Sequence, residues 1–473
     1  MSLVINTNIS SLQTQNNLSK SQSALAQATE RLSSGLKINS AADNAAGFAI
    51  SQQYTTQIGG LTQASANASD AINLAQTAGS ALDQVTSNLQ AIRDLAVQSA
   101  NGTYTSADRA SIDQEVQQRL QEITRIANQT TFNGSNILDG SLGTKSFQIG
   151  ANVGQTISVS LNTDVKASQI GQVAEVNTGS ISGAFAGLSV STGSGSGTGA
   201  LTVTTGGTGG TAVNVAVGTY HSVSGLAAAI NNAAGTGVAT VNSSGQLVLA
   251  SGTTLGGGDA TALGTVGSGG LVSGAQAAVG DLSAETLTIN GKAVKLTGVT
   301  SLQDLSDTIN AAGVSGVTAA VNAAGNGVNF YSSNALTISD STSGVITSGA
   351  TDGNTGVNFT AGSANASTGG SLANGNVLTV DSANDLISRI DVALTTVSNF
   401  SAQLGAVQNR FQSTISTVQA QTTNLQSSQS TIQDADFASE TASLSQAQVL
   451  QQAGISVLAQ ANSNPQQVLK LLQ

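Results

Sequence analysis

The sequence predicts an α+β protein in which the terminal helices pair as a coiled coil and continue into a long α-helical bundle, with β-rich domains inserted in the middle of the chain. Three observations support this prediction. Of the 54 glycines, 40 lie between residues 176 and 375, so the glycine-poor flanks favour long helices and the middle does not. Apolar residues recur at heptad spacing in both flanks. The single proline, Pro465, leaves nearly all of both flanks free of helix breakers.

The composition excludes several classes of protein. Only 8% of the 473 residues are charged and none is cysteine, so disulfides and thiolate metal sites are excluded. The net charge of -11 divides into -2 over residues 1–150, -6 over 151–375 and -3 over 376–473. Because no part is basic, neither nucleic acid nor membrane is expected as a partner. The sequence contains no run of 18 apolar residues, so no membrane span is expected. The N-terminus MSLVINTNIS does not look like a signal peptide.

Two helices are expected at the start of the chain. Leu18, Leu25 and Leu32 recur at intervals of seven and predict one narrow apolar seam, which the segment SSGLKINSAAD interrupts. A second helix is expected from about Asn44 to Ser99, with a length of ~80 Å at ~1.5 Å per residue. Its expected a and d positions are Leu82, Val85, Leu89, Ile92 and Ala96.

A third helix should follow the turn NGTYTSAD at residues 101–108. Ser106 is expected to open this helix, with Arg109 at the position where a capping box prefers Glu. Its apolar face is expected to hold Ile112, Val116, Leu120, Ile123 and Ala127. From Thr130 the apolar period shortens, which predicts short strands joined at Asn-Gly and Asp-Gly turns.

The middle of the chain contains a weak internal repeat. Residues 226–251 match residues 305–333, with Ile230-Asn231 aligned to Ile309-Asn310. Each copy predicts a strand pair, a short helix and further strands. We therefore expect a Gly/Ser/Thr-rich β region at 177–378, in two subunits of about 177–280 and 281–378.

The C-terminal flank has the most regular heptads of the sequence. The expected d positions of this intrachain coiled-coil core are Ile390, Val397, Leu404, Phe411, Val418 and Leu425. Ser401 and Gln408 fall at expected a positions, where polar residues weaken a seam but specify its register. We expect residues 386–425 to pack against the helices at 44–99 and 106–128.

The last helix keeps an apolar stripe to the end of the chain. Helical spacing places Leu450, Val457, Ala461, Val468 and Leu472 near one side. Two short helices, at 3–33 and 444–473, bury too little apolar surface to be stable alone. A stripe of this kind therefore predicts a covering segment, either in this chain or in another copy of it.

Four stretches of the sequence resemble bacterial flagellin. They are residues 4–51, 91–123, 132–140 and 446–473, which begin VINTNISSLQ, AIRDLAVQSA, FNGSNILDG and QAQVLQQAGI. The internal repeat is similar to a small inserted module of flagellins and hook-associated proteins. The resemblance covers both flanks, about 270 residues.

The resemblance implies a secreted, extracellular structural subunit that self-assembles into the bacterial flagellar filament for motility. It implies an inner terminal domain of 1–44 with 431–473 and a rod-like domain of 45–176 with 379–430. Expected partners are other copies in a helical homopolymer, the flagellar export apparatus, an export chaperone, and hook-associated and cap proteins. Subunit packing is expected at Leu18, Leu25, Leu32, Leu450, Val457, Leu458, Val468 and Leu472.

The resemblance also implies a surface that a Toll-like receptor reads in many flagellins. The matching residues are Gln90, Arg93, Leu95 and Glu115, although subunit contact is expected to be their primary role. Ala91 stands where many receptor-recognised members have Arg, so weakened receptor activation is expected.

No catalytic, metal or cofactor-binding residues are expected, and the chain is not expected to be an enzyme. His221 is the only histidine and lies in a Gly/Thr-rich segment, which favours a solvated loop. Two alternatives remain: a hook-associated junction protein of the flagellum, and a filament subunit whose central insert acts as an adhesin.

Overall fold

The computed structural model describes residues 8–185, 187–190, 200–207, 209–242, 245–275, 280, 282, 285–341 and 344–471, without the side chains of 184, 268 and 464–471. The chain divides into two compact units. The first comprises Met1–Gln76, Thr144–Ser160 and Gly405–Gln473, and the second comprises Thr77–Gly143 and Leu161–Leu404. None of the described helices combines the length and the hydropathy that crossing a bilayer requires. The predicted fold class, long terminal helices around a strand-rich middle, is confirmed.

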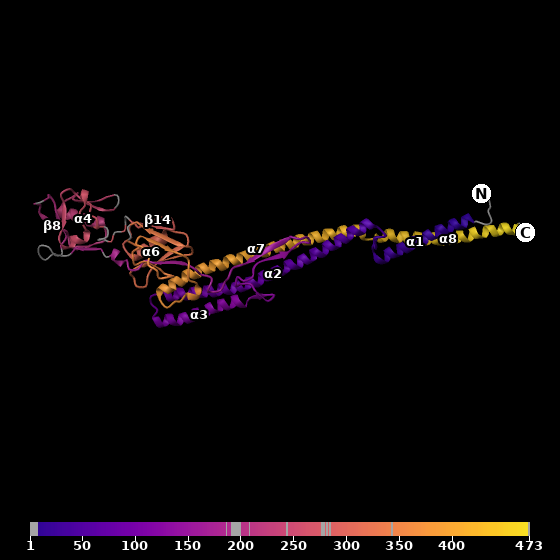
Figure 1. Ribbon diagram of the computed structural model, residues 1–473, viewed down its shortest axis with the longest axis horizontal. Helices are drawn as coiled ribbons and strands as arrows, with labels where there is room; N and C mark the ends of the chain where they lie inside the picture. The colour runs from indigo at the N-terminus through magenta and orange to yellow at the C-terminus, as the bar shows by residue number, and fades with distance from the viewer. Residues whose placement is uncertain are drawn as a thin grey trace. The chain divides into compact units, whose positions relative to one another are not determined.

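In the first unit, α1 (Ile9–Ser34) lies beside α8 (Phe437–Leu471) (Figure 1). The side chain of Asn8 caps the start of α1 by accepting from the N–H of Ser11. Gly35 ends the helix with a φ of 73°, a conformation that glycine adopts without strain. The predicted break after the first helix is confirmed.

Two long helices, α2 (Ala45–Ala100) and α7 (Val380–Gln433), pass through both units. The prediction for α2 is confirmed to within one residue at each end, and its five expected a and d residues are fully buried. In the first unit, Ser51 donates to Gln433 Oε1, and Gln429 Nε2 donates to Thr55 Oγ1 at 2.8 Å. These bonds join α2 and α7 where little apolar surface is buried.

The third helix, α3 (Ser106–Gln129), begins differently from the prediction. Thr105, and not Ser106, is the N-cap, and it forms a capping box with Asp108. Arg109 instead donates to the carbonyls of Ser99 and Asn101, at 2.9 and 3.1 Å. Its guanidinium thus satisfies carbonyls at the end of α2, which explains the arginine at this position. Four of the five predicted apolar residues are buried, and Ile112 is half-buried.

Two short hairpins follow α3. The first joins β1 (Thr131–Phe132) to β2 (Ser135–Asn136) through a predicted Asn-Gly turn, whose two residues both have positive φ. The second joins β3 (Gly143–Gln148) to β4 (Thr156–Leu161). The predicted Asp-Gly turn, Asp139-Gly140, lies between β2 and β3 but does not form a hairpin, because these two strands do not pair. Phe147 of β3 packs edge-on against Phe411 of α7, with ring centroids 5.7 Å apart.

The second unit contains a split module, so called because an incoming strand and a later segment build it together. Its helix is α6 (Leu302–Ala311), and its buried core is centred on Leu287, Phe330 and Ile338. The strands form two antiparallel sheets, in the orders β15-β16-β5-β18 and β14-β13-β17-β19. They are β5 (Ala174–Asn177), β13 (Thr286–Ile289), β14 (Lys292–Lys295), β15 (Val317–Val321), β16 (Val328–Ser332), β17 (Leu336–Asp340), β18 (Thr351–Asp352) and β19 (Ser363–Ala366). The boundary expected at 176/177 runs through β5.

The described residues of 188–275, between β5 and β13, form an inserted module with its own buried core. Its helix is α4 (Val223–Ala234), and its described strands are paired two or three to a sheet. They are β6 (Leu188–Val190), β7 (Thr202–Thr204), β8 (Ala212–Asn214), β9 (Gly218–Tyr220), β10 (Ala239–Val241), β11 (Leu247–Leu249) and β12 (Thr254–Gly256).

The internal repeat is confirmed by matching hydrogen bonds. Asn231 of α4 donates to the carbonyl of Ala239 at 2.7 Å and accepts from its N–H at 2.8 Å. Asn310 of α6 makes the same pair of bonds with Ala319, both at 2.8 Å. A side-chain amide is the group that can donate to and accept from one backbone residue, so these asparagines fix each helix to its next strand.

Candidate functional site

The terminal helices α1 and α8 form a narrow antiparallel seam. Ser11 Oγ donates to Asn462 Oδ1 at 2.7 Å, and Asn8 Nδ2 donates to the carbonyl of Ala461 at 2.8 Å. At the other end of the pair, Arg31 and Glu440 are 4.0 Å apart. The order of these contacts, early residues of α1 against late residues of α8, establishes the antiparallel arrangement.

The α1 side of this seam follows the predicted heptads. Leu18, Leu25 and Leu32 are all half-buried, and Ser11 and Ala28 are buried. A Cβ added to Gly454 of α8 would lie 3.3 Å from the Leu18 side chain, so glycine allows close approach of the helices there. One line of small and medium side chains therefore holds the pair together.

The predicted C-terminal stripe is divided between two faces of α8. Leu458 and Ala461 are half-buried on the α1 side, whereas Leu450 and Val457 are 50% and 55% exposed. The side chain of Val468 and the whole of Leu472 lie outside the described residues. Within one chain, α1 thus covers part of the stripe and leaves Leu450 and Val457 open to solvent.

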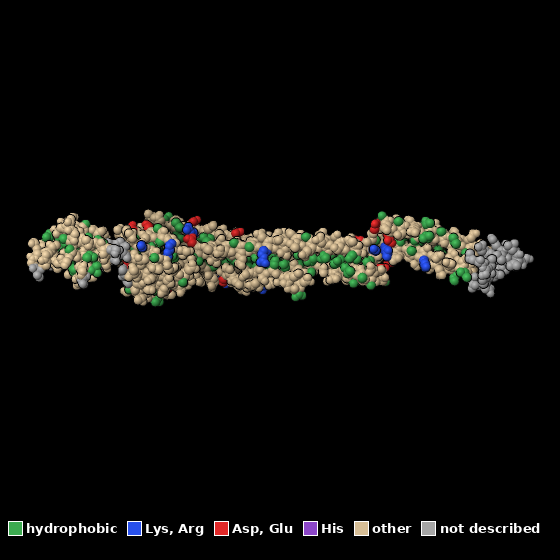
Figure 2. Space-filling model, turned by 90° about the horizontal axis from the view of Figure 1, so that it is seen from above, with side chains coloured by type: hydrophobic (Ala, Val, Ile, Leu, Met, Phe, Trp, Pro, Cys, Tyr) green, Lys and Arg blue, Asp and Glu red, His purple; other side chains and the backbone are tan. Residues whose placement is uncertain are grey.

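Further apolar side chains of the pair are open, and the sequence patterns did not single them out. Ile9 and Leu12 of α1 are 68% and 60% exposed, and Val449 and Ile455 of α8 are 64% and 54% exposed. Hydrophobic side chains reach the surface of the described part of this helix pair in Figure 2. Their signal was present in the sequence, because each is apolar yet falls off the heptad line of its helix. Exposed apolar residues grouped on one helix pair are typical of an interaction surface.

The α7 seam is built on the predicted d positions. Five of them are buried, and Leu425 is half-buried. The second buried row consists of Ala393, Phe400 and Val407, each one residue before the expected a positions Leu394, Ser401 and Gln408. Those three expected a residues are only half-buried, so the a assignment was wrong by one residue from Leu394 to Gln408. Ile415, the next expected a residue, is buried as predicted. The six predicted core residues are Ile390, Val397, Leu404, Phe411, Val418 and Leu425.

The four residues of the expected receptor surface lie on α2 and α3. Gln90 and Glu115 are exposed, and Arg93 and Leu95 are half-buried. Arg93 Nε lies 2.7 Å from Asp391 Oδ1, and this hydrogen bond raises the pKa of Arg93 further. Glu115 accepts from Arg119 at 2.7 Å, one turn along α3. Both charged residues are therefore engaged within the chain.

A catalytic or metal site in this chain would draw on His221 and the carboxylates. His221 is exposed, at the start of the turn that leads into α4. Among the described residues, no three histidine, aspartate or glutamate side chains are grouped closely enough to hold a metal ion. The surface of α1 and α8 is therefore the candidate site with the most specific features.

Comparisons with known proteins place these features in one family. Residues 5–142 match the family model for the bacterial flagellin N-terminal helical region, and residues 387–472 match that for the C-terminal helical region. A flagellin of Salmonella typhimurium is 38% identical, and a B-type flagellin of Pseudomonas aeruginosa 36%, each over the full length of both chains. The solved structure of FliC from Burkholderia pseudomallei is 24% identical over 72% of this chain and 99% of that one, at a TM-score of 0.32.

Proposed function

This chain belongs to the bacterial flagellin family. We propose that its copies pack through the exposed apolar residues of α1 and α8, Leu450 and Val457 among them, which we call the open face. The chain is a structural subunit that self-assembles into the extracellular filament of the bacterial flagellum, which serves motility. The proposal concerns which residues make that assembly possible.

The exposure of Leu450 and Val457 supports this proposal most directly. They lie seven residues apart on α8, so they share a face, and each leaves half or more of its surface in water. Burying a fully exposed aliphatic side chain of this size gains ~1.5 to 3 kcal/mol. Because Leu450 and Val457 are already half covered, the remaining gain is about half of that for each, and every subunit repeats it. We assign Val468 and Leu472 to the same face from their spacing, and Leu18, Leu25, Leu32 and Leu458 to the seam that presents it.

We propose that this surface contacts an unlike surface on the next copy, so that the contact repeats from copy to copy. When the rotation between neighbours fails to close a ring, repeated contacts build an open helix. Assembly then needs no catalyst in the chain, and we infer that the chain is not an enzyme. Measurable turnover by the purified protein on test esters or peptides would contradict this inference.

Replacement of Leu450 and Val457 by Asp together tests the assembly proposal. Two charges on the open face should reduce polymerisation from filament seeds at least tenfold, since each would be buried without a partner in the assembled state. Val217→Asp is the matched control, because Val217 is equally exposed, at 61%, but lies in the inserted module. Normal assembly of the double variant, or an equal defect in the control, would refute the proposal. Circular dichroism should show unchanged helix content for both proteins.

We propose that the chain functions as three parts. Residues 1–44 with 431–473 form an inner terminal part, and residues 45–176 with 379–430 form the helical rod. Residues 177–378 form the outer part, to which β5 also contributes through its pairing with β16 and β18. Limited proteolysis should cut first near these boundaries, and early cuts inside α2, or inside α7 well before residue 430, would argue against the division.

We also infer the partners that family membership favours. These are the flagellar export apparatus, an export chaperone for the C-terminal segment, and hook-associated and cap proteins at the filament ends. Removal of residues 446–473 should abolish copurification with a chaperone from cells that have not exported the chain.

We propose weak recognition by a Toll-like receptor through Gln90, Arg93, Leu95 and Glu115. Recognition should be weak because Ala91 stands where many recognised members have arginine. The activation of receptor reporter cells by the monomer measures the strength of this recognition.

A further inference from the structure

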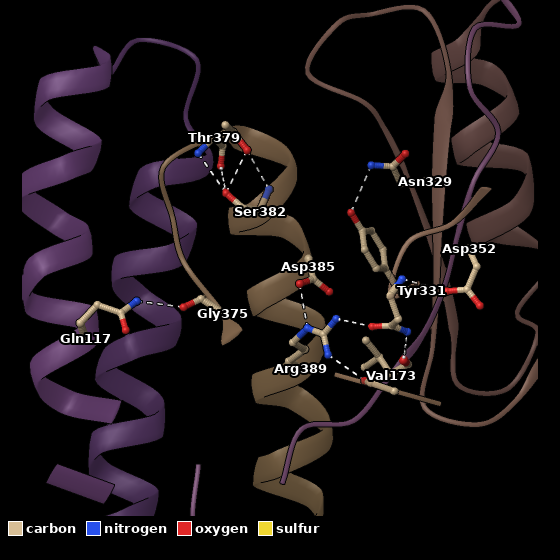
Figure 3. A network of polar contacts seen from close by, with 12 residues as sticks. Gln117, Val173, Asn329, Tyr331, Asp352, Gly375, Thr379, Ser382, Asp385 and Arg389 are labelled. Atoms are coloured by element: carbon tan, nitrogen blue, oxygen red, sulfur yellow. Dashed lines mark hydrogen bonds and ion pairs between the residues drawn. The ribbon is translucent and has the colours of Figure 1, made fainter. Parts of the chain in front are cut away.

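Arg389 of α7 fastens the split module to the helix. Its side chain is buried, and its guanidinium donates three hydrogen bonds in different directions (Figure 3). Nε donates to Asp385 Oδ2 at 2.7 Å, within α7. Nη1 donates to the carbonyl of Gly369 at 3.0 Å, and Nη2 donates to Asn354 Oδ1 at 2.8 Å. One side chain of α7 therefore holds two loops that belong to the split module.

The same network reaches the strand that leads into the split module. The carbonyl of Val173, directly before β5, accepts from Asn354 Nδ2 at 2.8 Å and from the N–H of Gly369 at 2.9 Å. Figure 3 shows Val173 close to the Arg389 guanidinium. The chain segments entering and leaving the split module are thus bound to each other and to α7 at one point, which we call the junction.

Glu175 lies inside this junction. It is the second residue of β5, it is only 8% exposed, and it is directly opposite Tyr331 in the register of β5 and β16. The carboxyl group packs against Gly353, where any Cβ would collide with it. The N–H of Gly353 donates to the backbone carbonyl of Glu175 at 3.0 Å. The side chain is therefore enclosed by the loop that Arg389 holds.

The junction carries more negative than positive charge. The groups that face Glu175 are Asp381, Asp385 and Arg389 of α7, Asp352 of β18 and Tyr331 of β16. The four carboxyl groups have one guanidinium among them. Asp385 Oδ1 is buried without a hydrogen-bond partner, so one carboxylate oxygen is already uncompensated. Arg389 can neutralise one carboxylate, and a further buried charge there is costly.

The proton affinity of the buried acids follows from this arrangement. Burial, and then the charge of Asp385, raise the pKa of Glu175 from 4.5 to about 7, against the opposing effect of Arg389. Burial also raises the pKa of Asp385, although Arg389 opposes it, and burial raises that of Tyr331. Glu175 is therefore the junction group that changes charge near neutral pH.

We propose that the junction is a pH-operated latch, closed when Glu175 carries a proton and loosened when Glu175 is ionised. An acid with a higher pKa in the closed state than in the open state holds its proton more tightly when closed. Closure is therefore fully favoured at pH values below 4.5 and weakens as pH rises to about 7. The latch acts on the attachment of the split module to α7 and does not depend on the assembly surface of α1 and α8.

Hydrogen exchange on the full-length monomer tests the latch. The reporting amides are those of Gly353, Gly369 and Leu372, which donate to backbone carbonyls across the junction. The exchange rates are first corrected for the pH dependence of exchange in free amides. The protection of these amides should then fall at least about tenfold between pH 5 and pH 8, because loss of one proton changes the closing equilibrium tenfold per pH unit. Glu175→Gln should abolish this difference and keep the amides protected at pH 8.

The control is Asp307→Asn, which removes one negative charge from the exposed face of α6 in the same module. This variant should keep the wild-type pH dependence. A wild-type protein with equal protection at both pH values, or a Glu175→Gln protein that retains the difference, would overturn the proposal. If Glu175→Gln does not fold, Asp385→Asn decides instead. It keeps an oxygen for Arg389 but removes the charge that raises the pKa of Glu175, so the midpoint of loosening must move to lower pH, and an unmoved midpoint refutes the latch.

Discussion

Arg93, on the proposed receptor surface, forms an exposed ion pair with Asp391. Its guanidinium and the carboxylate of Asp391 are 42% and 51% exposed, so the ion pair between them contributes ~1 kcal/mol or less. A binding partner can therefore displace Asp391 at little cost. Ala91, one residue beyond the exposed Gln90, offers no polar group at all. The missing arginine, more than the engagement of Arg93, should limit recognition by the receptor.

Ala91→Arg should therefore raise receptor activation by the monomer. A hydrogen bond to a charged group contributes ~1.5 to 3 kcal/mol, which corresponds to a gain in potency of about tenfold or more. Val217→Arg adds the same charge to an exposed position of the inserted module, outside α2 and α3, and should leave potency unchanged. Dose-response curves in receptor reporter cells measure both effects. Unchanged potency of Ala91→Arg, or full potency of the wild-type monomer, would contradict the proposed recognition.

At the scale of elements, α7 shows what heptad spacing determines and what it leaves open. After Ile390, both Ala393 and Leu394 are apolar, and a helix places residues three and four positions away on the same side. The sequence therefore located the row of Ile390 correctly but could not choose its partner row. The structure buries Ala393 and Phe400, with Leu394 and Ser401 at the edge of the seam.

Substitutions at two adjacent residues of α7 test which of the two rows is buried. Phe400 is 2% exposed, and Phe400→Ala should lower the free energy of unfolding by ~3 to 5 kcal/mol through the cavity that it leaves. Ser401→Ala should change it by no more than ~0.5 kcal/mol, since Ser401 is half-buried at the edge of the seam. Urea titrations followed by circular dichroism compare the two variants. A larger effect of the serine substitution would show that Ser401, as expected from the sequence, occupies the buried row.

Other features depend on contacts that no local pattern reveals. β5 has four residues and pairs with β16, some 150 residues later, so its membership of the split module could not be found from its own sequence. In the sequence, Arg389 is a polar residue next to the heptad position Ile390, and nothing near it indicates its partners Asn354 and Gly369. By contrast, Leu18, Leu25 and Leu32 could be placed because seam positions in paired helices follow local spacing.

At the scale of the whole molecule, the chain separates the helices that we propose to assemble from the inserted module. The inserted module buries its apolar residues in a core of its own, which shares none of the split module's core residues. The open apolar residues of α1 and α8 belong to the other unit of the chain. Nothing in the described core of the inserted module is needed to present them.

Deletion of residues 187–279, with a short glycine-serine linker in their place, should therefore leave assembly intact. A flexible linker of this kind adds little constraint to the split module that remains. Polymerisation from filament seeds should proceed within about twofold of the wild-type rate, because the terminal helices retain the surface that copies bury. Truncation of residues 444–473 is the opposing control and should abolish assembly. Electron microscopy shows both outcomes, and a folded deletion variant that fails to polymerise would place part of the subunit contact in the inserted module.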